Sequence, residues 1–460
     1  MSTAPAFASL DLPATLLQGI DALGYQSMTP VQAQALPAIL AGRDVIAQAP
    51  TGSGKTAAFG LGLLSRLDPA RIQTQALVLC PTRELADQVG KQLRKLAIGI
   101  PNLKLSILCG GIPLGPQLAS LTHAPHVVVG TPGRIQELVK QRALQLDGVR
   151  ALVLDEADRM LDMGFEEAIR DIVKRLPKDR QGLLFSATYP DGIRALGAAM
   201  LRDPLEVSIG DGMQPAAIEQ LFFEVDAARR APALAAVLLR HRPESAVVFC
   251  NTRADTVEVV GSLSHYGFSA LALHGEMEQR DRDEVLVQFA NRSCNVLVAS
   301  DVAARGLDVE DLGAVVNYEL PSDADTYLHR IGRTGRAGRD GLALSLCAPR
   351  ELPRARAIEE RQGRPLRWEP LQPLSGKAAN VPTALMATLR IDAGRGDKLR
   401  AGDIVGALTG DAGLHKDAIG RIDVFATRSY VAIARKHAPR ALAALRAGRI
   451  KGRRFRVSPL

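Results

Sequence analysis

Residues 43–56 read RDVIAQAPTGSGKT, a short apolar run that leads into a glycine-rich turn and then into a helical pattern from about Lys55. A strand, such a turn and a helix in this order are typical of a phosphate-binding loop. The glycines let backbone N–H groups converge on phosphate oxygens, and the start of the helix adds favourable partial charge. The residues expected to form this cradle are Ala49, Thr51, Gly52, Ser53, Gly54, Lys55 and Thr56.

The functional groups of this loop point to a nucleotide and a metal. Lys55 is expected to reach the terminal phosphates, and the hydroxyl of Thr56 can ligate Mg²⁺. Ala49 stands where the general pattern has glycine. The alternative interpretation is a glycine-rich turn that only caps a helix.

A second apolar run, VRALVLDEAD at residues 149–158, ends in two adjacent acids, Asp155 and Glu156. An acid at the end of a strand beside a phosphate-binding loop can hold Mg²⁺, and the next acid can orient and deprotonate an attacking water. The alternative is a pair of surface acids that only terminate a strand. The two motifs together favour a nucleotide-hydrolysing site.

Apolar runs alternate with helical patterns through the first three quarters of the chain, which predicts α/β architecture with parallel sheets. The run ALVLCPTR at 76–83 resembles AVVFCNTR at 246–253, an offset of 253 − 83 = 170 residues. Two further pairs follow in the same order: LSILCGG with LALHG, and VVVGTPGR with VLVASDVAARG. The repetition predicts two tandem lobes of similar β-α-β order.

Proline, glycine and aspartate gather at residues 203–215, and four prolines lie within residues 365–382, so both stretches are interpreted as joints. From about residue 381 the pattern becomes β-α-β-β-α-β, the RRM-like layout. We therefore predict a first lobe at 1–206, a second lobe at 207–370, a linker at 371–382 and an RRM-like α+β domain at 383–460.

The composition of the 460 residues, 47% hydrophobic and 23% charged, is typical of folded domains and excludes wholesale disorder. The basic excess is local: residues 375–460 hold 17 Lys+Arg against 6 Asp+Glu, a net of +11, which leaves 40 − 43 = −3 for the rest. Aromatic residues make up only 4%, so charge and backbone contacts are favoured over base stacking for any nucleic-acid site.

The five cysteines are odd in number and far apart, which favours a reducing compartment over a disulfide framework or a zinc cluster. The N-terminal residues lack the pattern of a signal peptide, and no stretch approaches the roughly 18 apolar residues of a membrane span. We therefore expect a cytoplasmic protein with no membrane partner.

The second lobe has no glycine-rich Lys-Thr loop, but residues 329–339, HRIGRTGRAGR, place arginines three residues apart. Arginines supplied by a facing lobe can stabilise the charge of a phosphoryl group in the transition state. The spacing fits one face of a helix, although the glycines favour a turn-rich segment. A solvated basic patch or a plain RNA-backbone contact is the alternative.

Taken together, these motifs resemble the DEAD-box ATP-dependent RNA helicases of superfamily two, over nearly the whole chain. The name-giving motif is DEAD at residues 155–158. Phe7, then GY at 24–25 and PVQ at 30–32, resemble the adenine-recognising motif of the family. The resemblance implies two RecA-like lobes, ATP and Mg²⁺ as cofactors, RNA-dependent ATP hydrolysis, and Gln32 as the contact to adenine.

The resemblance also implies roles for further residues. In the second lobe Gly306 and Asp308 would contact the nucleotide, Arg333 and Arg336 would be arginine fingers, and His329 would link to the first lobe. Hydrolysis would be coupled to strand separation by Ser186, Ala187 and Thr188. The RNA backbone would be held by Pro81, Thr82, Arg83, Gly110, Gly111, Thr131, Pro132, Gly133, Arg134, Thr252, Arg253, Gln279, Arg282, Ser300 and Asp301.

The stretches KLRAGDIVGALTGDAGL at 398–414 and GRIKGRRFRV at 448–457 resemble the C-terminal domain of the DbpA subfamily. Members of that subfamily bind a hairpin of large-subunit ribosomal RNA, which implies local unwinding of short duplexes in 23S-type RNA and in pre-ribosomal particles during large-subunit assembly. The residues expected to contact RNA in this domain are Lys398, Arg400, Tyr430, Lys451 and Arg453.

Three alternatives remain open for the function. The basic tail could only improve nonspecific RNA retention. The protein could be an RNA-binding assembly factor whose ATPase is incidental, which would remodel RNA equally well with Lys55→Ala. It could be a DNA-directed helicase, whose ATPase DNA would stimulate as strongly as RNA.

Overall fold

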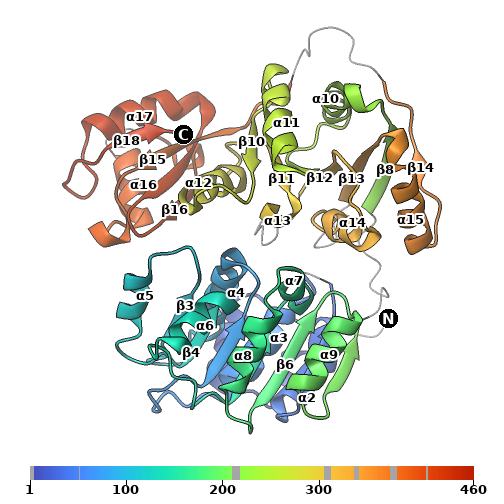
Figure 1. The fold of residues 1–460 in the computed structure, drawn as a ribbon. Helices are drawn as coiled ribbons and strands as arrows, with labels where there is room; N and C mark the ends of the chain where they lie inside the picture. The colour runs from blue at the N-terminus through green and yellow to red at the C-terminus, as the bar shows by residue number, and fades with distance from the viewer. Residues whose placement is uncertain are drawn as a thin grey trace. The chain divides into compact units, whose positions relative to one another are not determined.

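The computed structural model describes residues 5–50, 52–209, 218–304, 312–335, 341–372, 381–410 and 413–460 (Figure 1). The chain divides into two compact units, Met1–Gln214 and Pro215–Leu460, and each is described by itself. The site predictions for Thr51, Gly306, Asp308 and Arg336 lie outside the described residues, as do residues 373–380 of the predicted linker.

The first unit, the first lobe, is built on a parallel sheet of seven described strands in the order β3-β4-β2-β5-β6-β1-β7. The strands are β1 Val45–Gln48, β2 Ala76–Leu79, β3 Leu105–Leu108, β4 Val127–Gly130, β5 Ala151–Leu154, β6 Gln181–Ser186 and β7 Leu205–Ser208. Its central strands read as continuous apolar runs because both faces of the sheet are covered by helices.

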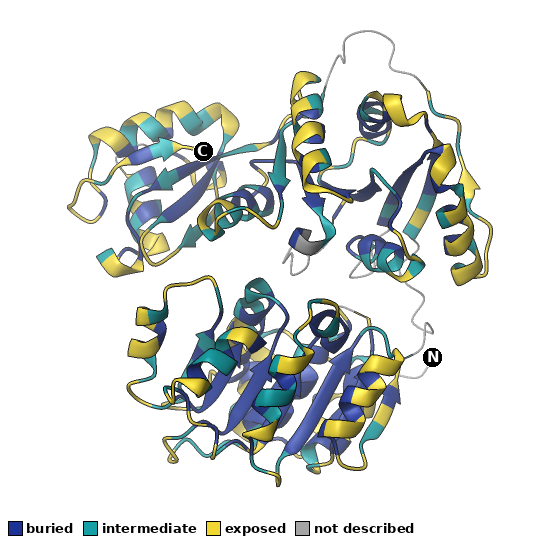
Figure 2. Cartoon of the chain, viewed as in Figure 1, coloured by how far each residue is buried: buried dark blue, intermediate teal, exposed yellow. Residues whose placement is uncertain are grey.

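The helices of the first lobe are α1 Ala14–Ala22, α2 Pro30–Leu40, α3 Lys55–Ser65, α4 Arg83–Leu96, α5 Leu114–Ser120, α6 Pro132–Lys140, α7 Ala157–Asp162, α8 Glu166–Lys174 and α9 Asp191–Met200. They enclose two cores, one on each face of the sheet: Val45 and Ala47 of β1 enter one core, and Ile46 enters the other. Figure 2 shows the strands buried and the outer sides of the helices exposed. This packing leaves the ends of the parallel strands to carry the polar groups of a site.

The second unit begins with a second lobe whose seven described strands are also parallel, in the order β10-β11-β9-β12-β13-β8-β14. The strands are β8 Ile218–Glu224, β9 Ala246–Cys250, β10 Ala270–Leu273, β11 Val296–Ser300, β12 Ala314–Asn317, β13 Gly341–Cys347 and β14 Arg367–Trp368. The helices are α10 Arg230–His241, α11 Arg253–His265, α12 Gln279–Ala290, α13 Asp301–Ala304, α14 Ala324–Ile331 and α15 Leu352–Gln362. The two lobes match strand for strand, so the predicted duplication is confirmed.

The same unit ends in the C-terminal domain, a four-stranded antiparallel sheet in the order β16-β17-β15-β18. Its elements are β15 Met386–Ile391, α16 Ala401–Thr409, β16 Ile419–Val424, β17 Ser429–Ala434, α17 Ala438–Ala447 and β18 Val457–Pro459. This is the predicted β-α-β-β-α-β order. Leu389 and Val431 of the sheet pack against Ile404 and Leu445 of the two helices, so the helices cover one face of the sheet.

Candidate nucleotide and RNA site

The glycine-rich loop connects β1 to α3 in a conformation that depends on its glycines. Gly52 and Gly54 have φ angles of 83° and 92°, and Gly54 is the residue that precedes the first turn of α3. Such angles are favourable only for glycine. The Nζ of buried Lys55 donates a hydrogen bond to the carbonyl of Ala49 at 2.8 Å, so the lysine closes over the loop. The loop therefore presents the backbone and the cation expected of a phosphate cradle.

The adenine-recognising motif lies against this loop. The Gln32 Nε2 donates to the carbonyl of Gly54 at 3.0 Å, while its Oε1 accepts from the backbone N–H of Thr29 at 2.8 Å. The side chain of Gln32 is buried. Phe7 is also buried and stacks on Tyr25, with ring centroids 6.3 Å apart. Gln32 is thus positioned by backbone groups beside the helix start that carries Lys55.

The predicted metal ligands have the chemistry that Mg²⁺ requires. The Asp155 carboxylate at the end of β5 and the Thr56 hydroxyl in α3 are hard oxygen donors. The buried Oγ of Ser53 in the loop has no hydrogen-bond partner among the described residues, which is expected of a group that meets a phosphate. The donor set therefore fits a nucleotide with Mg²⁺.

The electrostatics of Asp155 agree with a cation site. Burial raises the pKa of Asp155 to about 7, a shift that the nearby Lys55 opposes and the nearby Glu156 adds to. A carboxylate whose ionised form is disfavoured by burial gains from any divalent cation that approaches it. Among the described residues, no cluster of three or more His, Cys, Asp or Glu side chains is arranged to hold a metal ion.

Glu156 is held by an arginine that the sequence analysis did not single out. Its Oε2 lies 2.6 Å from the Nη1 of Arg159, and both side chains are about nine-tenths buried. The two residues lie three positions apart at the start of α7, where side chains share a face. The ion pair fixes the position of the Glu156 carboxylate, the group predicted to orient and deprotonate water. The i,i+3 spacing was the signal that could have identified Arg159.

Asp158, the last acid of the motif, binds the segment predicted to couple hydrolysis to strand separation. Its Oδ2 accepts hydrogen bonds from the backbone N–H groups of Ala187 and Thr188, at 3.1 and 2.9 Å, and from the Thr188 hydroxyl at 3.0 Å. The Ser186 hydroxyl accepts from the backbone N–H of Asp158 at 3.3 Å. The backbone of Ser186 in turn accepts from the N–H of Ala49 in the phosphate loop at 3.0 Å. A continuous chain of contacts thus joins the three motifs.

The predicted RNA contacts of the first lobe gather where neighbouring strands β2, β3 and β4 end. Pro81 follows β2, and Thr82 caps α4 by accepting from the backbone N–H of Leu85 at 3.3 Å. The guanidinium of Arg83 lies directly beside Gly111, since a Cβ at that glycine would be 2.7 Å from its Nη1. The absence of a side chain at Gly111 is therefore what admits Arg83.

The third predicted RNA-contact segment of the first lobe, residues 131–134, follows β4. Its first residue, Thr131, precedes α6 and contacts the segment at Gly110. Its Oγ1 accepts from the backbone N–H of Gly110 at 3.2 Å. Residues 132–133 form the first turn of α6. The guanidinium of Arg134 donates to the carbonyl of Ile112 at 3.2 Å, so it is held against the loop that follows β3. All of the RNA contacts predicted for this lobe are thus brought to one end of its sheet.

In the second lobe, Arg330 and Arg333 take different positions. Arg330 lies in α14 and is 2% exposed; it binds Asp301 through two hydrogen bonds of 2.7 Å and Asn317 at 3.1 Å. Arg333 lies beyond the end of α14, as the glycines indicated, and His329 lies in its last turn. Arg330 is therefore a core residue that ties strand ends together.

The RNA contacts predicted for the second lobe repeat those of the first. Thr252 caps α11 by accepting from a backbone N–H in its first turn at 3.2 Å, and exposed Arg253 follows it. Gln279 and Arg282 lie in the first turn of α12. Ser300 ends β11, beside the end of β9. The equivalent strand ends of the two lobes thus carry equivalent polar groups.

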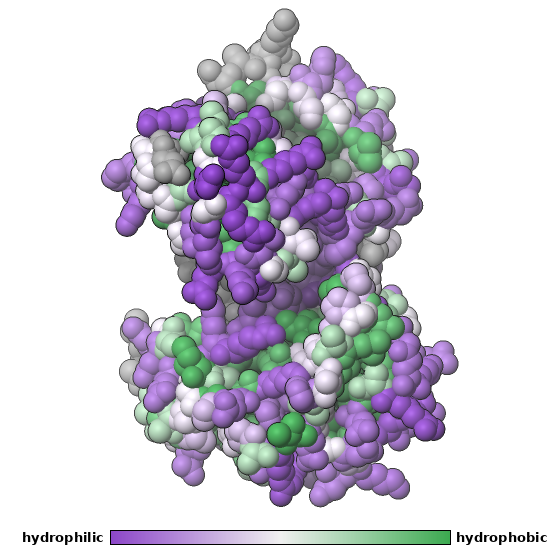
Figure 3. Space-filling view, turned by 90° about the vertical axis from the view of Figure 1, so that its left-hand side faces the viewer, coloured by the Kyte–Doolittle hydropathy of each residue, from purple (hydrophilic) through white to green (hydrophobic). Residues whose placement is uncertain are grey.

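The C-terminal predictions separate into two groups. Lys398 and Arg400 precede α16, Lys451 and Arg453 follow α17, and the Nζ of Lys451 donates to the carbonyl of Lys398 at 2.9 Å. All four side chains are exposed, and Figure 3 shows hydrophilic side chains over much of the face of this domain that it displays. Tyr430 instead is buried on the sheet, where its hydroxyl donates a hydrogen bond to the Glu284 carboxylate at 3.2 Å.

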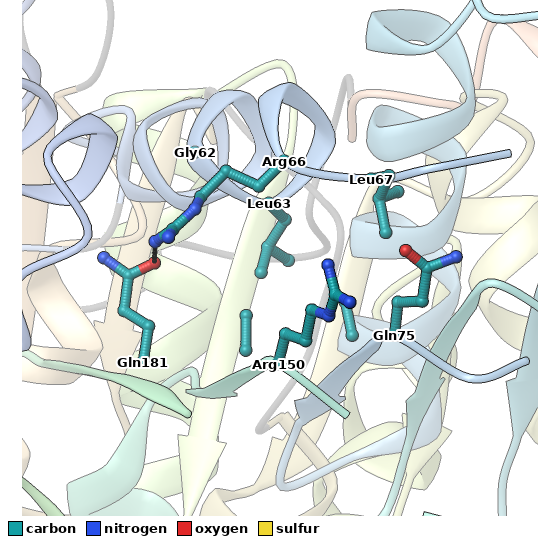
Figure 4. A pocket seen from close by; sticks show the side chains of 9 residues that line it. Gly62, Leu63, Arg66, Leu67, Gln75, Arg150 and Gln181 are labelled. Carbon is teal, nitrogen blue, oxygen red and sulfur yellow. Dashed lines mark hydrogen bonds between the residues drawn. The ribbon is translucent and has the colours of Figure 1, made fainter. Parts of the chain in front are cut away.

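A small cavity in the first lobe lies away from these groups (Figure 4). It is lined by Arg66 near the end of α3 and by the first residues of three strands, Ala76, Ala151 and Gln181. The Nη1 of Arg66 donates to the Oε1 of Gln181 at 3.4 Å across it. These are the opposite ends of the strands from the phosphate loop, so the cavity has no part in the candidate site.

A phosphate loop beside strand-end acids in one lobe, and an arginine segment in a second lobe of the same topology, define a nucleotide-hydrolysing helicase core. The DEAD/DEAH box helicase family model matches residues 29–196, and the helicase conserved C-terminal domain matches residues 229–338. The DbpA RNA binding domain matches residues 388–459.

The chain is 52% identical to the ATP-dependent RNA helicase DbpA of Escherichia coli over 98% of its length and 99% of that protein. It is 41% identical to the ATP-dependent RNA helicase CshA of Listeria monocytogenes over 84% of its length and 74% of that protein. The solved structure of Saccharomyces cerevisiae Dbp5 bound to RNA and ADP BeF3 is similar, with a TM-score of 0.74 and 32% identity over 80% of this chain and 96% of that one. This chain therefore belongs to the DEAD-box ATP-dependent RNA helicases of the DbpA type.

Proposed function

We propose that this helicase unwinds short RNA duplexes locally, and that its C-terminal domain directs it to large-subunit (23S-type) ribosomal RNA during assembly of the large ribosomal subunit. The observation that carries the target is the DbpA RNA binding domain matched at residues 388–459, in a segment of net charge +11. A basic surface supplies affinity for RNA phosphates, and contacts to bases or to the shape of the RNA supply selectivity. Its partners would be a ribosomal RNA hairpin and pre-ribosomal particles in the cytoplasm.

In the proposed reaction the first lobe binds ATP and activates water. Gln32 would contact adenine, and the loop from Ala49 to Thr56 would hold the phosphates. Mg²⁺, held by Thr56 and Asp155, would neutralise phosphate charge. Glu156, held in place by Arg159, would orient a water and take its proton.

The second lobe would complete the site. Arg333 and Arg336 would stabilise the charge of the transferring phosphoryl group, Gly306 and Asp308 would contact the nucleotide, and His329 would link to the first lobe. Because the proposed catalytic groups are divided between the two lobes, hydrolysis would require the lobes to close on bound ATP and RNA.

RNA would be held by the strand-end groups of both lobes through its sugar-phosphate backbone. Such contacts do not read bases, so they fit any strand and can bend it out of a duplex. The contacts of Asp158 with Ala187 and Thr188 supply a route by which the state of the nucleotide site reaches the coupling segment.

We also propose the domain division at residues 1–206, 207–370 and 383–460, with a linker at 371–382. Three separate sheets support the division into three parts, because their described strands lie within residues 45–208, 218–368 and 386–459. The last strand of the first sheet, β7, extends two residues past the proposed boundary at 206.

Steady-state ATPase tests the proposal with no RNA, generic RNA, large-subunit ribosomal RNA fragments and DNA. We expect the hairpin-containing ribosomal fragment to stimulate at the lowest concentration. Glu156→Gln is expected to lower stimulated turnover by about 10² to 10⁴, the usual contribution of a general base. Exposed Glu167→Gln is the matched control.

Three outcomes would contradict the proposal. Equal stimulation by every RNA rejects specific targeting, and equal stimulation by DNA favours a DNA-directed enzyme. Undiminished RNA remodelling by Lys55→Ala would show that the ATPase is incidental.

A further inference from the structure

The segment that follows β3 in the first lobe presents an apolar surface to solvent. Residues 111–119 read GIPLGPQLA and include no charged residue, and Ile112 and Leu118 are 42% and 37% exposed. Figure 2 shows α5, which belongs to this segment, largely exposed at the left of the first lobe. Single exposed apolar residues are ordinary on a protein surface, but several in one uncharged segment indicate a contact surface.

The buried side chain of Gln117 holds this segment in one conformation. Its Oε1 accepts from the backbone N–H of Cys109 at 3.1 Å, and its Nε2 donates to the carbonyl of the same residue at 3.0 Å. The Nε2 also lies 3.4 Å from the carbonyls of Ile112 and Pro113. A buried amide that pairs with loop backbone groups takes the place of water there. The exposed apolar residues therefore belong to an ordered loop.

Arg134 holds the same loop from the neighbouring segment. Both of its terminal nitrogens lie 3.2 Å from the carbonyl of Ile112, and its Nε donates to the Oε2 of Glu137 at 2.9 Å. The Arg134 side chain is 9% exposed. Its guanidinium is thus engaged with the protein, and the result is a fixed position for Ile112.

Arg83 lies against the loop as well, with a donor that faces no acceptor. Its Nη1 is buried and has no hydrogen-bond partner among the described residues. A Cβ at Gly111 would be 2.7 Å from this same nitrogen, so the donor lies beside the first residue of the apolar segment. A buried guanidinium donor without a partner is costly until an anion meets it. This donor therefore fits a phosphate of the bound RNA strand.

The position of this donor decides what Ile112 meets. Ile112 follows Gly111 directly, and the Cα atoms of consecutive residues are about 3.8 Å apart. Every phosphate of an RNA strand is joined to a sugar that carries a base, so a strand held by Arg83 has a sugar and a base close to Ile112. Isoleucine, leucine and proline side chains contact bases that have left their stack, and they offer no hydrogen bond to a phosphate.

We propose that the loop at residues 111–113, with Ile112 at its centre, is an apolar contact for one unstacked base of the RNA strand, next to the phosphate held by Arg83. The assignment rests on the RNA contacts proposed for the first lobe, and it adds a base to contacts that otherwise hold only the sugar-phosphate backbone. An aliphatic contact accepts any base, so it strengthens binding without reading sequence. It favours a single strand over a duplex, because the bases of a duplex are stacked on one another.

The contact is tested in the full chain by the dependence of ATPase on generic single-stranded RNA. Ile112→Ser is expected to raise the KM for RNA about tenfold with little change in kcat, the size expected when one aliphatic side chain loses its contact. Ile112→Leu keeps an apolar side chain and is expected to retain the parent KM. An unchanged KM in Ile112→Ser would overturn the proposal.

The matched control is Ile72→Ser. Ile72 is 71% exposed and precedes β2, so it lies at the opposite end of the sheet from the RNA contacts. The same substitution there is expected to leave the KM for RNA unchanged. Thermal denaturation of both variants confirms that the first lobe is folded, as expected for substitutions at exposed side chains.

A strand from which every base has been removed, with its sugars and phosphates kept, identifies the partner of Ile112. In the parent protein, removal of the bases is expected to raise the KM about tenfold. In Ile112→Ser the two strands are expected to have the same KM, because the contact is already lost. An equal effect of base removal on the parent and on Ile112→Ser would overturn the proposal.

Salt dependence separates the apolar contact from the phosphate contact. Loss of one phosphate contact lowers the slope of log KM against log salt concentration by about 0.7 on a single strand, and this is the result expected for Arg83→Gln. Ile112→Ser is expected to keep the parent slope. A lowered slope in Ile112→Ser would overturn the apolar contact.

These measurements also distinguish this proposal from the proposed function. If Arg83→Gln keeps the KM and the slope of the parent, the phosphate contact proposed for the first lobe fails, and the strand without bases still decides the role of Ile112. If Arg83→Gln behaves as expected while base removal affects the parent and Ile112→Ser equally, the contact to a base fails and the phosphate contact stands.

Discussion

The two helicase lobes share one strand order but use corresponding strand ends for different chemistry. β5 and β12 hold the same place in their sheets. β5 is followed by Asp155 and Glu156, buried acids beside a lysine of the phosphate loop, whereas β12 ends in Asn317, which binds the buried Arg330. Topology therefore decides where strand ends meet, and the residues placed there decide whether the meeting point hydrolyses a nucleotide or stabilises the lobe.

The lobes remain alike where a structural need is shared. Thr82 after β2 and Thr252 after β9 cap their helices with the same hydrogen bond, at 3.3 and 3.2 Å. A helix that begins at a strand end needs an acceptor for the free N–H groups of its first turn, whether or not its lobe binds a nucleotide through a phosphate loop. The resemblance between the two sequence runs around these threonines thus has a structural cause.

The largest expected effect comes from replacing Arg330, which tests whether the strand ends of the second lobe stabilise that lobe. Arg330→Met leaves Asp301 without its two 2.7 Å hydrogen bonds. The expected cost is about 3 kcal/mol, the lower end of the range for a buried pair, because the Asp301 side chain is 28% exposed. We expect hydrogen exchange to show this loss within the second lobe only. Arg350→Met, at a largely exposed arginine that is 3.5 Å from Glu319, is the control. Equal protection from hydrogen exchange in the two variants would show that Arg330 does not stabilise the second lobe.

The corresponding test in the first lobe is Asp158→Ala. The change leaves the backbone donors of Ala187 and Thr188 without their acceptor, at a cost of about 1–3 kcal/mol. Because these donors belong to the segment proposed to couple hydrolysis to strand separation, we expect unwinding to fall more than ATPase does. Both are measured beside Asp179→Ala, a fully exposed acid. A parallel fall in the two activities would argue against a coupling role.

The shared caps should behave alike. Thr82→Ala and Thr252→Ala are each expected to lower the stability of their own lobe by about 1 kcal/mol, while the two Ser variants keep the hydroxyl and the stability. Denaturation followed by hydrogen exchange in each lobe checks this. Unequal costs would mean that the two caps are not equivalent.

The smallest expected effect is pH-dependent and confined to the second lobe. Burial, followed by the charge of Arg240, lowers the pKa of His241, and its ring packs edge-on against Phe223. The unfolded chain therefore takes up a proton at a higher pH than the folded one, so stability is lost as the pH falls below the usual range of histidine near 6.5. His241→Gln is expected to weaken the dependence on pH of the denaturation midpoint of the second lobe. The control is the same substitution at exposed His415.

Much of the nucleotide site was predictable because its residues are local in the chain. The phosphate loop needs consecutive residues between a strand and a helix, so Lys55 and its glycines could be assigned from spacing alone. Arg330 was the harder case: three-residue spacing placed it among possible RNA or phosphate contacts, yet it is a buried residue bound to Asp301 and Asn317. The spacing of residues cannot distinguish a charge that faces solvent from one that is paired inside the lobe.

The linear order of residues by itself determined the two α/β lobes, the RRM-like order of the C-terminal elements and the place of the phosphate loop. Periodicity, glycine positions and strand-end acids are local properties that short-range forces impose. Only the tertiary structure decided that Arg159 holds Glu156, that Asp158 binds Thr188, and that Glu284 binds Tyr430, 146 residues further along the chain. The last two pairings join distant segments, and which buried polar group meets which partner depends on the packing of the whole unit.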